Sequence, residues 1–354
     1  MAFISPTDTI QPHPLPTGIL IVNTGTPATP EPGEIRKYLR EFLSDRRVIR
    51  WPRWLWLPLL HLIILRVRPA RVASKYKDIW IEGGSPLLRD SLALVDGLER
   101  KLQGEYGMHA GVAVGMRYGH PSIRDGLREL RDRGAQRLII LPLFPQYSHV
   151  TVASVYDAVF EELHRWRQVP EVEAVRGYHL QPTYIHAITQ SIEAYWQVYG
   201  KPDRLLISYH GIPLSYAAAG DPYPEHCTET TERIFEQLGQ KELLVESSFQ
   251  SRFGPEAWAQ PYTEATLAQW AQESGGRVDV ICPGFAVDCL ETLHEIAVEA
   301  CGLYLDSGGE DFHYIPALNT RRGHIELLTE IIRPYLPVEQ HEDSMLVKNS
   351  GDEV

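Results

Sequence analysis

The sequence predicts an α/β protein with two similar, doubly wound domains built on parallel sheets. Its 354 residues are enough for about two domains, each with its own core. Short apolar runs alternate with segments of helical period, a pattern typical of parallel sheets with helices on both faces. A pair of motifs also recurs in the same order in both halves of the chain.

The predicted strands are apolar runs of four to five residues, and the predicted helices are amphipathic segments between them. Strands are expected at residues 18–22, 137–141, 205–208 and 278–282, because such short runs bounded by polar residues are typical of buried strands. Helices are expected at 121–133 and 263–272.

The internal repeat relates the two halves. Ile-Leu-Ile-Val-Asn-Thr-Gly-Thr-Pro at 19–27 resembles Leu-Leu-Ile-Ser-Tyr-His-Gly-Ile-Pro at 205–213, and Ile-Ile-Leu-Pro-Leu-Phe at 139–144 resembles Val-Ile-Cys-Pro-Gly-Phe at 280–285. The motifs of the first half are about 45 residues further apart, which indicates an insertion. We therefore predict an N-terminal extension (1–16), a first domain (17–180) with an inserted segment at about 46–85, a second domain (181–336) and a disordered acidic tail (337–354).

Composition and charge exclude several classes of protein. The net charge of −12 argues against nucleic acid as a partner. Four cysteines without a Cys-x-x-Cys pair fit a reducing compartment, and the first residues lack the basic and apolar regions of a secretory signal. We expect a cytoplasmic protein.

The inserted segment is basic and rich in tryptophan. No acidic residue lies between Asp45 and Asp78, whereas nine arginines and lysines do. The apolar run inside it is too short to span a bilayer. It could be a buried helix, a membrane-surface patch, or the wall of a site for a large, flat, apolar ligand that carries carboxylates.

Four carboxylates and one histidine are the candidate site residues. Read as a helix, residues 283–300 place the carboxylates of the acid ladder three and four residues apart on one face, although like charges at this spacing repel. The ladder consists of Asp288, Glu291, Glu295 and Glu299. It is either a solvated face or a path for cations and protons.

His210 follows a predicted strand directly, and Asp288 follows another after a short loop. Because ligands of open parallel sheets bind beyond the carboxyl ends of the strands, the histidine and the ladder are expected to face one cleft. His120 also follows a strand, and its role is left open between function and structure. A neutral imidazole facing carboxylates can hold a divalent first-row metal ion or accept protons.

Several long motifs of this chain resemble those of the ferrochelatases. They include Tyr-Leu-Arg-Glu-Phe-Leu-Ser-Asp (38–45), Met-Arg-Tyr-Gly-His-Pro (116–121), Leu-Phe-Pro-Gln-Tyr-Ser (143–148), Ser-Tyr-His-Gly-Ile-Pro (208–213), Phe-Gln-Ser-Arg-Phe-Gly (249–254) and Pro-Gly-Phe-Ala-Val-Asp-Cys-Leu-Glu-Thr-Leu (283–293). The likeness runs from about residue 18 to 335. It implies two Rossmann-like domains around a porphyrin cleft, and insertion of Fe²⁺ into a porphyrin at the end of haem synthesis.

The resemblance also implies roles for individual residues. His210 becomes the base and Glu291 the opposing carboxylate, and both become the metal ligands. Asp288, Glu295 and Glu299 become a proton and metal relay on a helix with a π-bulge. Residues 51–66 become the lip over the porphyrin. The porphyrin-binding candidates are Trp54, Trp56, Leu57, Arg66, Arg68, Ser85, Tyr118 and Tyr147.

Two departures from the family pattern concern the ladder. Cys289 stands where many relatives have histidine, and His294 where many bacterial ones have glutamate. Since no cysteine follows Cys301, we expect no [2Fe–2S] cluster and no tightly bound cofactor, with Fe²⁺ as a substrate.

The apolar lip favours protoporphyrin IX over coproporphyrin III. The alternatives are a coproporphyrin ferrochelatase, a cobalt or nickel chelatase for another tetrapyrrole, and a non-catalytic haem or porphyrin carrier. Peripheral contact of the lip with the inner membrane face, and contact with other haem-pathway enzymes, are further expectations.

Overall fold

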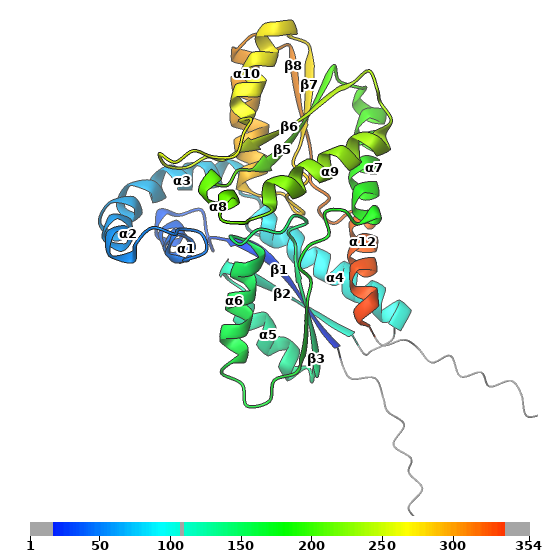
Figure 1. The fold of residues 1–354 in the computed structure, drawn as a ribbon. Coiled ribbons are helices and arrows are strands. Elements are labelled where there is room, and N and C mark those ends of the chain that lie inside the picture. Colours follow the sequence, from blue (N-terminus) through cyan, green and yellow to red (C-terminus); the bar gives the residue numbers. More distant parts are fainter. Residues whose placement is uncertain (1–16, 107–109, 337–354) are drawn as a thin grey trace, which may run out of the picture.

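Each half of the chain forms a parallel sheet of four strands (Figure 1). The structure, a computed structural model, describes residues 17–106 and 110–336. The first sheet has the order β2-β1-β3-β4, from Thr17–Thr26 (β1), Ala110–Gly119 (β2), Arg137–Pro142 (β3) and Glu171–Ala174 (β4). The second has the order β6-β5-β7-β8, from Arg204–His210 (β5), Leu244–Gln250 (β6), Arg277–Ile281 (β7) and Asp311–Ile315 (β8).

Helices connect the strands in both halves. The first half contains Pro32–Ser44 (α1), Arg53–Leu59 (α2), a π-helix at Leu60–Ile64 (η1), Leu65–Ile79 (α3), Pro86–Tyr106 (α4), Ile123–Asp132 (α5) and Val152–Leu163 (α6). The second contains Pro182–Tyr199 (α7), Leu214–Ala218 (α8), Tyr223–Leu238 (α9), Thr263–Ser274 (α10), a π-helix at Glu291–Ala300 (η3), Cys301–Asp306 (α11), Arg322–Ile332 (α12) and a 3₁₀ turn at Arg333–Tyr335 (η4).

The matching strand orders confirm the prediction of two similar α/β sheets. β1 pairs with β2 and β3, and β5 pairs in the same way with β6 and β7, so the repeated motifs occupy equivalent central strands. The four predicted strands and both predicted helices are present, with ends shifted by a few residues. Among the described residues, no helix is long and apolar enough to cross a membrane.

The two sheets share apolar packing at their junction. One cluster of buried side chains includes Ile19 and Ile21 of β1 together with Leu205 and Ile207 of β5. α12, near the end of the described chain, packs against both α4 and α7 (Figure 1). This shared core fixes the halves relative to each other, although the boundary at 180/181 stays a prediction. The predictions for residues 1–16 and 337–354 lie outside the described residues.

The inserted segment forms the lip at the side of the junction, where α2, η1 and α3 follow one another (Figure 1). Its inner face has a small core with α1, which includes Trp56, Leu60 and Tyr76. The start of the inserted segment also reaches the second half, because the Tyr216 hydroxyl donates to the carbonyl of Val48 over 2.9 Å. The insertion therefore forms one wall of the space between the halves.

One local prediction needs correction. The helix expected over residues 283–300 leaves residues 283–289 irregular, so Asp288 lies before the helix and not on its face. The carboxylate of Asp288 is instead occupied by hydrogen bonds from elements outside the helix, described below.

Candidate active site

His210 ends the central strand β5 with one ring nitrogen already engaged. Its Nδ1 lies 2.7 Å from the carbonyl oxygen of Gly211. A carbonyl only accepts, so Nδ1 carries the hydrogen and, in the neutral ring, Nε2 carries the lone pair. Gly211 lets the chain pass close to the end of β6, because a Cβ on this residue would meet the Gln250 carbonyl at 3.1 Å. The strand end thus presents a base or metal ligand in a fixed tautomer.

The ladder glutamates stand on the π-helix η3, in accordance with the bulged helix that the resemblance implied. Glu295 is the inner of the two relay candidates, and Ser251 donates a 2.6 Å hydrogen bond to its Oε2. Burial raises the pKa of Glu295; the Ser251 hydrogen bond and the charge of His210 act in the opposite direction, and Glu291 raises it further. His210, Glu291 and Glu295 therefore form one electrostatically coupled group.

Glu299 ends the ladder at the surface. It pairs with Lys75 of α3 at 2.6 Å, and both side chains are exposed. A cavity of about 410 Å³ is lined by Glu295 and Glu299 together with residues of α10 and α11. The carboxylates thus run from the buried coupled group to a solvent-accessible cavity.

Asp288 is held apart from this line. Its Oδ1 accepts from the hydroxyls of Thr292 at 2.9 Å and Tyr314 at 2.5 Å, and its Oδ2 accepts from the amide of Asn319 at 2.7 Å. The side chain is buried. These hydrogen bonds connect the start of η3 to β8 and to the loop after β8, so the contacts of Asp288 are structural.

Cys289, the departure from the family pattern, is also buried. Burial raises the pKa of its thiol well above the ordinary value, and the charge of Glu291 adds to the shift. The thiol therefore stays protonated beside Glu291. His294, the other departure, is bound through Nε2 to Asp78 of α3 at 3.0 Å, so it joins η3 to the inserted segment.

His324 supports the loop that carries Asn319, and its burial predicts a pH effect on stability. Its Nδ1 donates to the Asn319 carbonyl over 2.6 Å, and burial lowers its pKa to about 4. The unfolded chain takes up this proton below about pH 6.5 and the folded chain does not, so stability falls as the pH drops. Between pH 6.5 and 5 the loss from this group is about 2 kcal/mol.

Urea unfolding across this pH range measures the effect. His324→Gln should reduce the pH dependence of the free energy of unfolding by that amount. An unchanged slope in the variant would show that His324 is not the group responsible.

The lip and α1 together contribute a cation and two neutral phenols close to Glu291. The guanidinium of Arg68 lies 4.7 Å from the ring of Phe253, in the loop after β6. Burial lowers the pKa of Arg68, and the charge of Glu291 opposes this. Burial raises the pKa values of Tyr38 and Tyr76 well above normal, and nearby ionisable groups, Glu291 among them, raise them further. No carboxylate among the described residues pairs with Arg68 within 4.0 Å, so its charge can serve a ligand.

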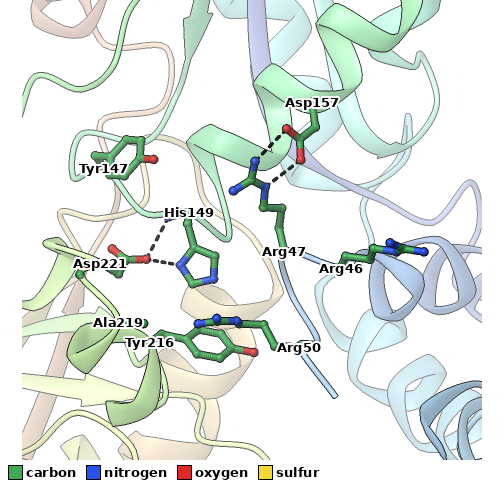
Figure 2. A pocket seen from close by; sticks show the side chains of 10 residues that line it. Arg46, Arg47, Arg50, Tyr147, His149, Asp157, Tyr216, Ala219 and Asp221 are labelled. Atoms are coloured by element: carbon green, nitrogen blue, oxygen red, sulfur yellow. Dashed lines mark hydrogen bonds and ion pairs between the residues drawn. The ribbon is translucent and has the colours of Figure 1, made fainter. Parts of the chain in front are cut away.

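A second cavity, of about 520 Å³, lies between the halves (Figure 2). This cavity is lined on one side by three arginines from the segment before the lip, which are Arg46, Arg47 and Arg50. The opposite side consists of residues of α8 and of the loops that follow β3 and α8. Arg47 is bound by Asp157 at 2.7 and 3.0 Å, and Arg50 lies over the ring of Tyr216 at 5.6 Å. His149 is fixed across the junction by Asp221, 2.6 Å from its Nδ1. The cavity is rimmed by cations and aromatic rings, as a flat anionic ligand requires.

The predicted porphyrin-binding residues fall into three groups. Trp54 is 75% exposed on the lip, Leu57 is partly buried and Arg66 is exposed. Tyr147 lines the cavity between the halves, here called the interdomain cavity, and the guanidinium of Arg176 lies over its ring, 4.4 Å from the ring centre. Trp56, Ser85 and Tyr118 are buried; Trp56 donates to the Leu43 carbonyl, and Tyr118 to Asp45.

The side chains of Trp56 and Tyr118 are therefore engaged within the protein, and contact of these two and of Ser85 with a porphyrin stays a prediction. Sequence reasoning missed Arg46, Arg50 and His149 as lining residues, although the excess of basic residues before the lip was a signal for the arginines.

Comparison with known proteins agrees with the fold and shows the family. A model of the ferrochelatase family matches residues 16–336. The chain is 46% identical to the ferrochelatase of Nitrosococcus oceani, over 90% of this chain and 86% of the relative. It is 45% identical to that of Vibrio cholerae, over 89% of this chain and 97% of the relative.

Solved structures add the fold. SirB from Bacillus subtilis with Fe³⁺ superposes with a TM-score of 0.53 at 11% identity, covering 90% of this chain and 95% of SirB. From the family match and the extent of the identity, the chain belongs to the ferrochelatase family.

Proposed function

We propose that this protein inserts Fe²⁺ into protoporphyrin IX and releases two protons to give protohaem. The observation that carries the proposal is this coupled group: the Nδ1 contact of His210 leaves Nε2 of the neutral ring free to accept a proton or a metal ion, and Glu295 interacts electrostatically with both His210 and Glu291. Insertion needs both a proton acceptor and weak oxygen and nitrogen ligands for a divalent ion, and this group supplies both.

In the proposed reaction the porphyrin loses its two N–H protons as the iron forms bonds to the ring nitrogens. His210 Nε2 takes one pyrrole proton as general base after it has released the Fe²⁺, because its single lone pair cannot bind both, and the second proton passes to the carboxylate of Glu295. His210 and Glu291 hold the incoming Fe²⁺ by exchangeable ligands, since tight ligation would oppose transfer to the ring. Bending of the bound macrocycle between the walls exposes the nitrogen lone pairs, which favours the transition state.

Glu295 and Glu299 are proposed to carry protons and metal ions between this group and solvent. The raised pKa of Glu295 suits a group that accepts and releases protons. Glu299 lines the solvent-accessible cavity with it. Asp288 takes part by fixing the start of η3, through the hydrogen bonds described above.

The porphyrin carboxylates are proposed to bind arginines of the inserted segment, among them Arg66 and Arg68. We expect Arg68→Gln to raise the Kd for protoporphyrin IX about tenfold, because a charge-assisted hydrogen bond is lost from a mostly buried site. Fluorescence titration measures Kd. Arg71→Gln, at an exposed position of the same helix, is the matched control and should bind as the wild type does. Equal binding by both variants would remove Arg68 from the propionate site.

The exposed lip also bears on location. Trp54, Leu62 and Ile63 project apolar surface from α2 and η1. This supports the expectation of peripheral membrane contact for a cytoplasmic enzyme, as does the basic charge around the lip. Absence of an iron–sulfur cluster and contact with other enzymes of haem synthesis stay predictions.

The deciding experiment is anaerobic incubation of the purified protein with Fe²⁺ and either protoporphyrin IX or coproporphyrin III. We expect a Soret shift to the metalloporphyrin with faster turnover of protoporphyrin IX, because the lip is apolar. Faster turnover of the four-carboxylate substrate would favour the coproporphyrin enzyme. Binding of either porphyrin without metal insertion would favour a carrier.

A further inference from the structure

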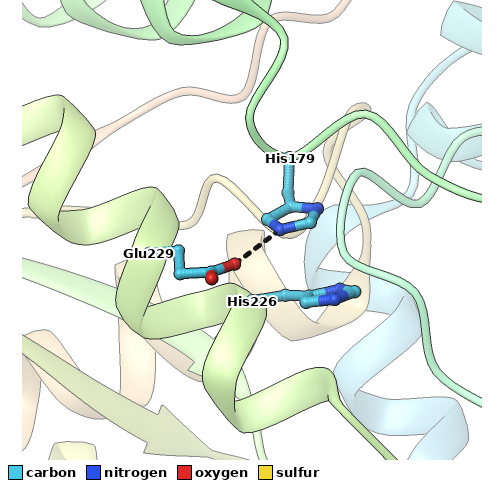
Figure 3. Close-up of side chains that lie close together, drawn as sticks. All are labelled: His179, His226 and Glu229. Atoms are coloured by element: carbon cyan, nitrogen blue, oxygen red, sulfur yellow. Dashed lines mark hydrogen bonds and ion pairs between the residues drawn. The ribbon is translucent and has the colours of Figure 1, made fainter.

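Three side chains that the proposed reaction does not use lie together beside the second sheet. His179 is in the loop between β4 and α7, and His226 and Glu229 are on α9. One ligand atom from each lies within 4.8 Å of the other two. Figure 3 shows His179 facing Glu229, with the ring of His226 beside them.

The sequence spacing and the packing fix this arrangement. His226 and Glu229 are three residues apart on α9 and so share one face of the helix. The His179 and His226 rings stack at 3.8 Å between centroids, and Nε2 of His179 lies 2.9 Å from Oε2 of Glu229.

The cluster also leaves a polar atom without a partner. Nδ1 of His226 is buried and makes no hydrogen bond to any described residue. An unpaired buried nitrogen costs free energy, which a bound ligand could recover after a small ring rotation. The surrounding charges are mixed, because Arg176 disfavours a proton on His226 and Asp221 favours one.

We propose that His179, His226 and Glu229 bind a divalent first-row metal ion of the Zn²⁺ or Co²⁺ type, separate from the Fe²⁺ that is the substrate. Two imidazole nitrogens and one carboxylate are a common donor set for such ions and leave a fourth position for water. The metal takes the place of the hydrogen bond between His179 and Glu229. This inference goes beyond the proposed function and does not depend on it.

Such an ion joins two parts of the site. The loop that carries His179 is tied to the first half, because the Tyr178 amide donates to the Pro145 carbonyl over 2.9 Å. Pro145 is two residues before Tyr147, which lines the interdomain cavity, and α9 begins two residues after Asp221 on the opposite side. A bound ion thus links the walls of that cavity from behind.

The test is equilibrium dialysis of the full chain against Co²⁺. The parent is the double variant His210→Ala, Glu291→Gln, in which the ligands of the substrate ion are removed, so the result is independent of iron insertion. We expect one bound Co²⁺ per chain in the parent, and its loss on adding His226→Ala or Glu229→Ala. His164→Gln, an exposed histidine at the end of α6, is the matched control and should retain the ion.

Glu229→Ala keeps the test valid if the His226 variant unfolds, because Glu229 is exposed and its removal leaves the core intact. Thermal unfolding without metal checks that each variant is folded. A parent that binds no Co²⁺, or a folded Glu229→Ala variant that binds it as tightly as the parent, overturns the proposal.

Discussion

Replacing His210 with alanine is expected to lower kcat for iron insertion by about a thousandfold or more while protoporphyrin IX still binds. General-base catalysis by a positioned histidine contributes about 10²–10⁴ in rate, and His210 is also a proposed metal ligand, so both contributions are lost together. The contacts that hold the porphyrin are proposed to come from the lip and the interdomain cavity, and His210 meets only the reacting pyrrole nitrogens. Kd should therefore change little.

Anaerobic assays with Fe²⁺ measure kcat, and fluorescence quenching measures porphyrin binding. His164→Ala, which removes an exposed histidine from the first half, is the control for general effects of the substitution. Turnover within tenfold of wild type in the His210 variant would contradict its role as the base. A parallel loss of porphyrin binding would instead assign His210 to the cavity wall.

The sheets and the position of His210 were predictable from sequence for a physical reason. A strand buried on both faces must be apolar along its length, and a parallel sheet collects its functional groups at the carboxyl ends of its strands. The run Leu205–Ser208 followed by Tyr-His-Gly carries both signals locally. The repeated motif then places the same strand order in each half, as found.

Which side chains of the lip face solvent and which face the core could not be predicted in this way. Trp54 and Trp56 are two residues apart in one apolar run, yet the first is exposed and the second is buried against Leu43. Their environment depends on how α2 packs on α1 and on the π-helical turn that follows, and the composition of the run specifies neither. Clusters such as His179 with Glu229, 50 residues apart, likewise arise only when the chain folds.

The same limit applies to Asp288, because its sequence spacing matches the ladder but its contacts do not. Thr292 and Tyr314 donate to one of its oxygens and Asn319 to the other, and these partners come from η3, β8 and the loop after β8. Sequence spacing identifies a shared helix face only where the helix exists, and η3 begins three residues later. We therefore propose that Asp288 positions η3.

Asp288→Ala is expected to lower the free energy of unfolding by about 4 kcal/mol, because it removes one partner of a buried, charged hydrogen-bond network and leaves the Tyr314 hydroxyl and the Asn319 amide without an acceptor. Asp288→Asn should cost less, since it keeps Oδ1 and loses the contact from Asn319. Urea unfolding at pH 7 measures both. Glu299→Ala, in an exposed ion pair on the same π-helix, should change stability by less than about 1 kcal/mol.

The two roles of Asp288 predict different results for kcat. An anchor loses stability and kcat together, since Glu291 and Glu295 move with the start of η3. A relay group loses kcat in Asp288→Asn at unchanged stability. The second result would support a relay role for Asp288. Protons would then need a route from its buried carboxylate to Glu291 that the hydrogen bonds of Asp288 do not provide.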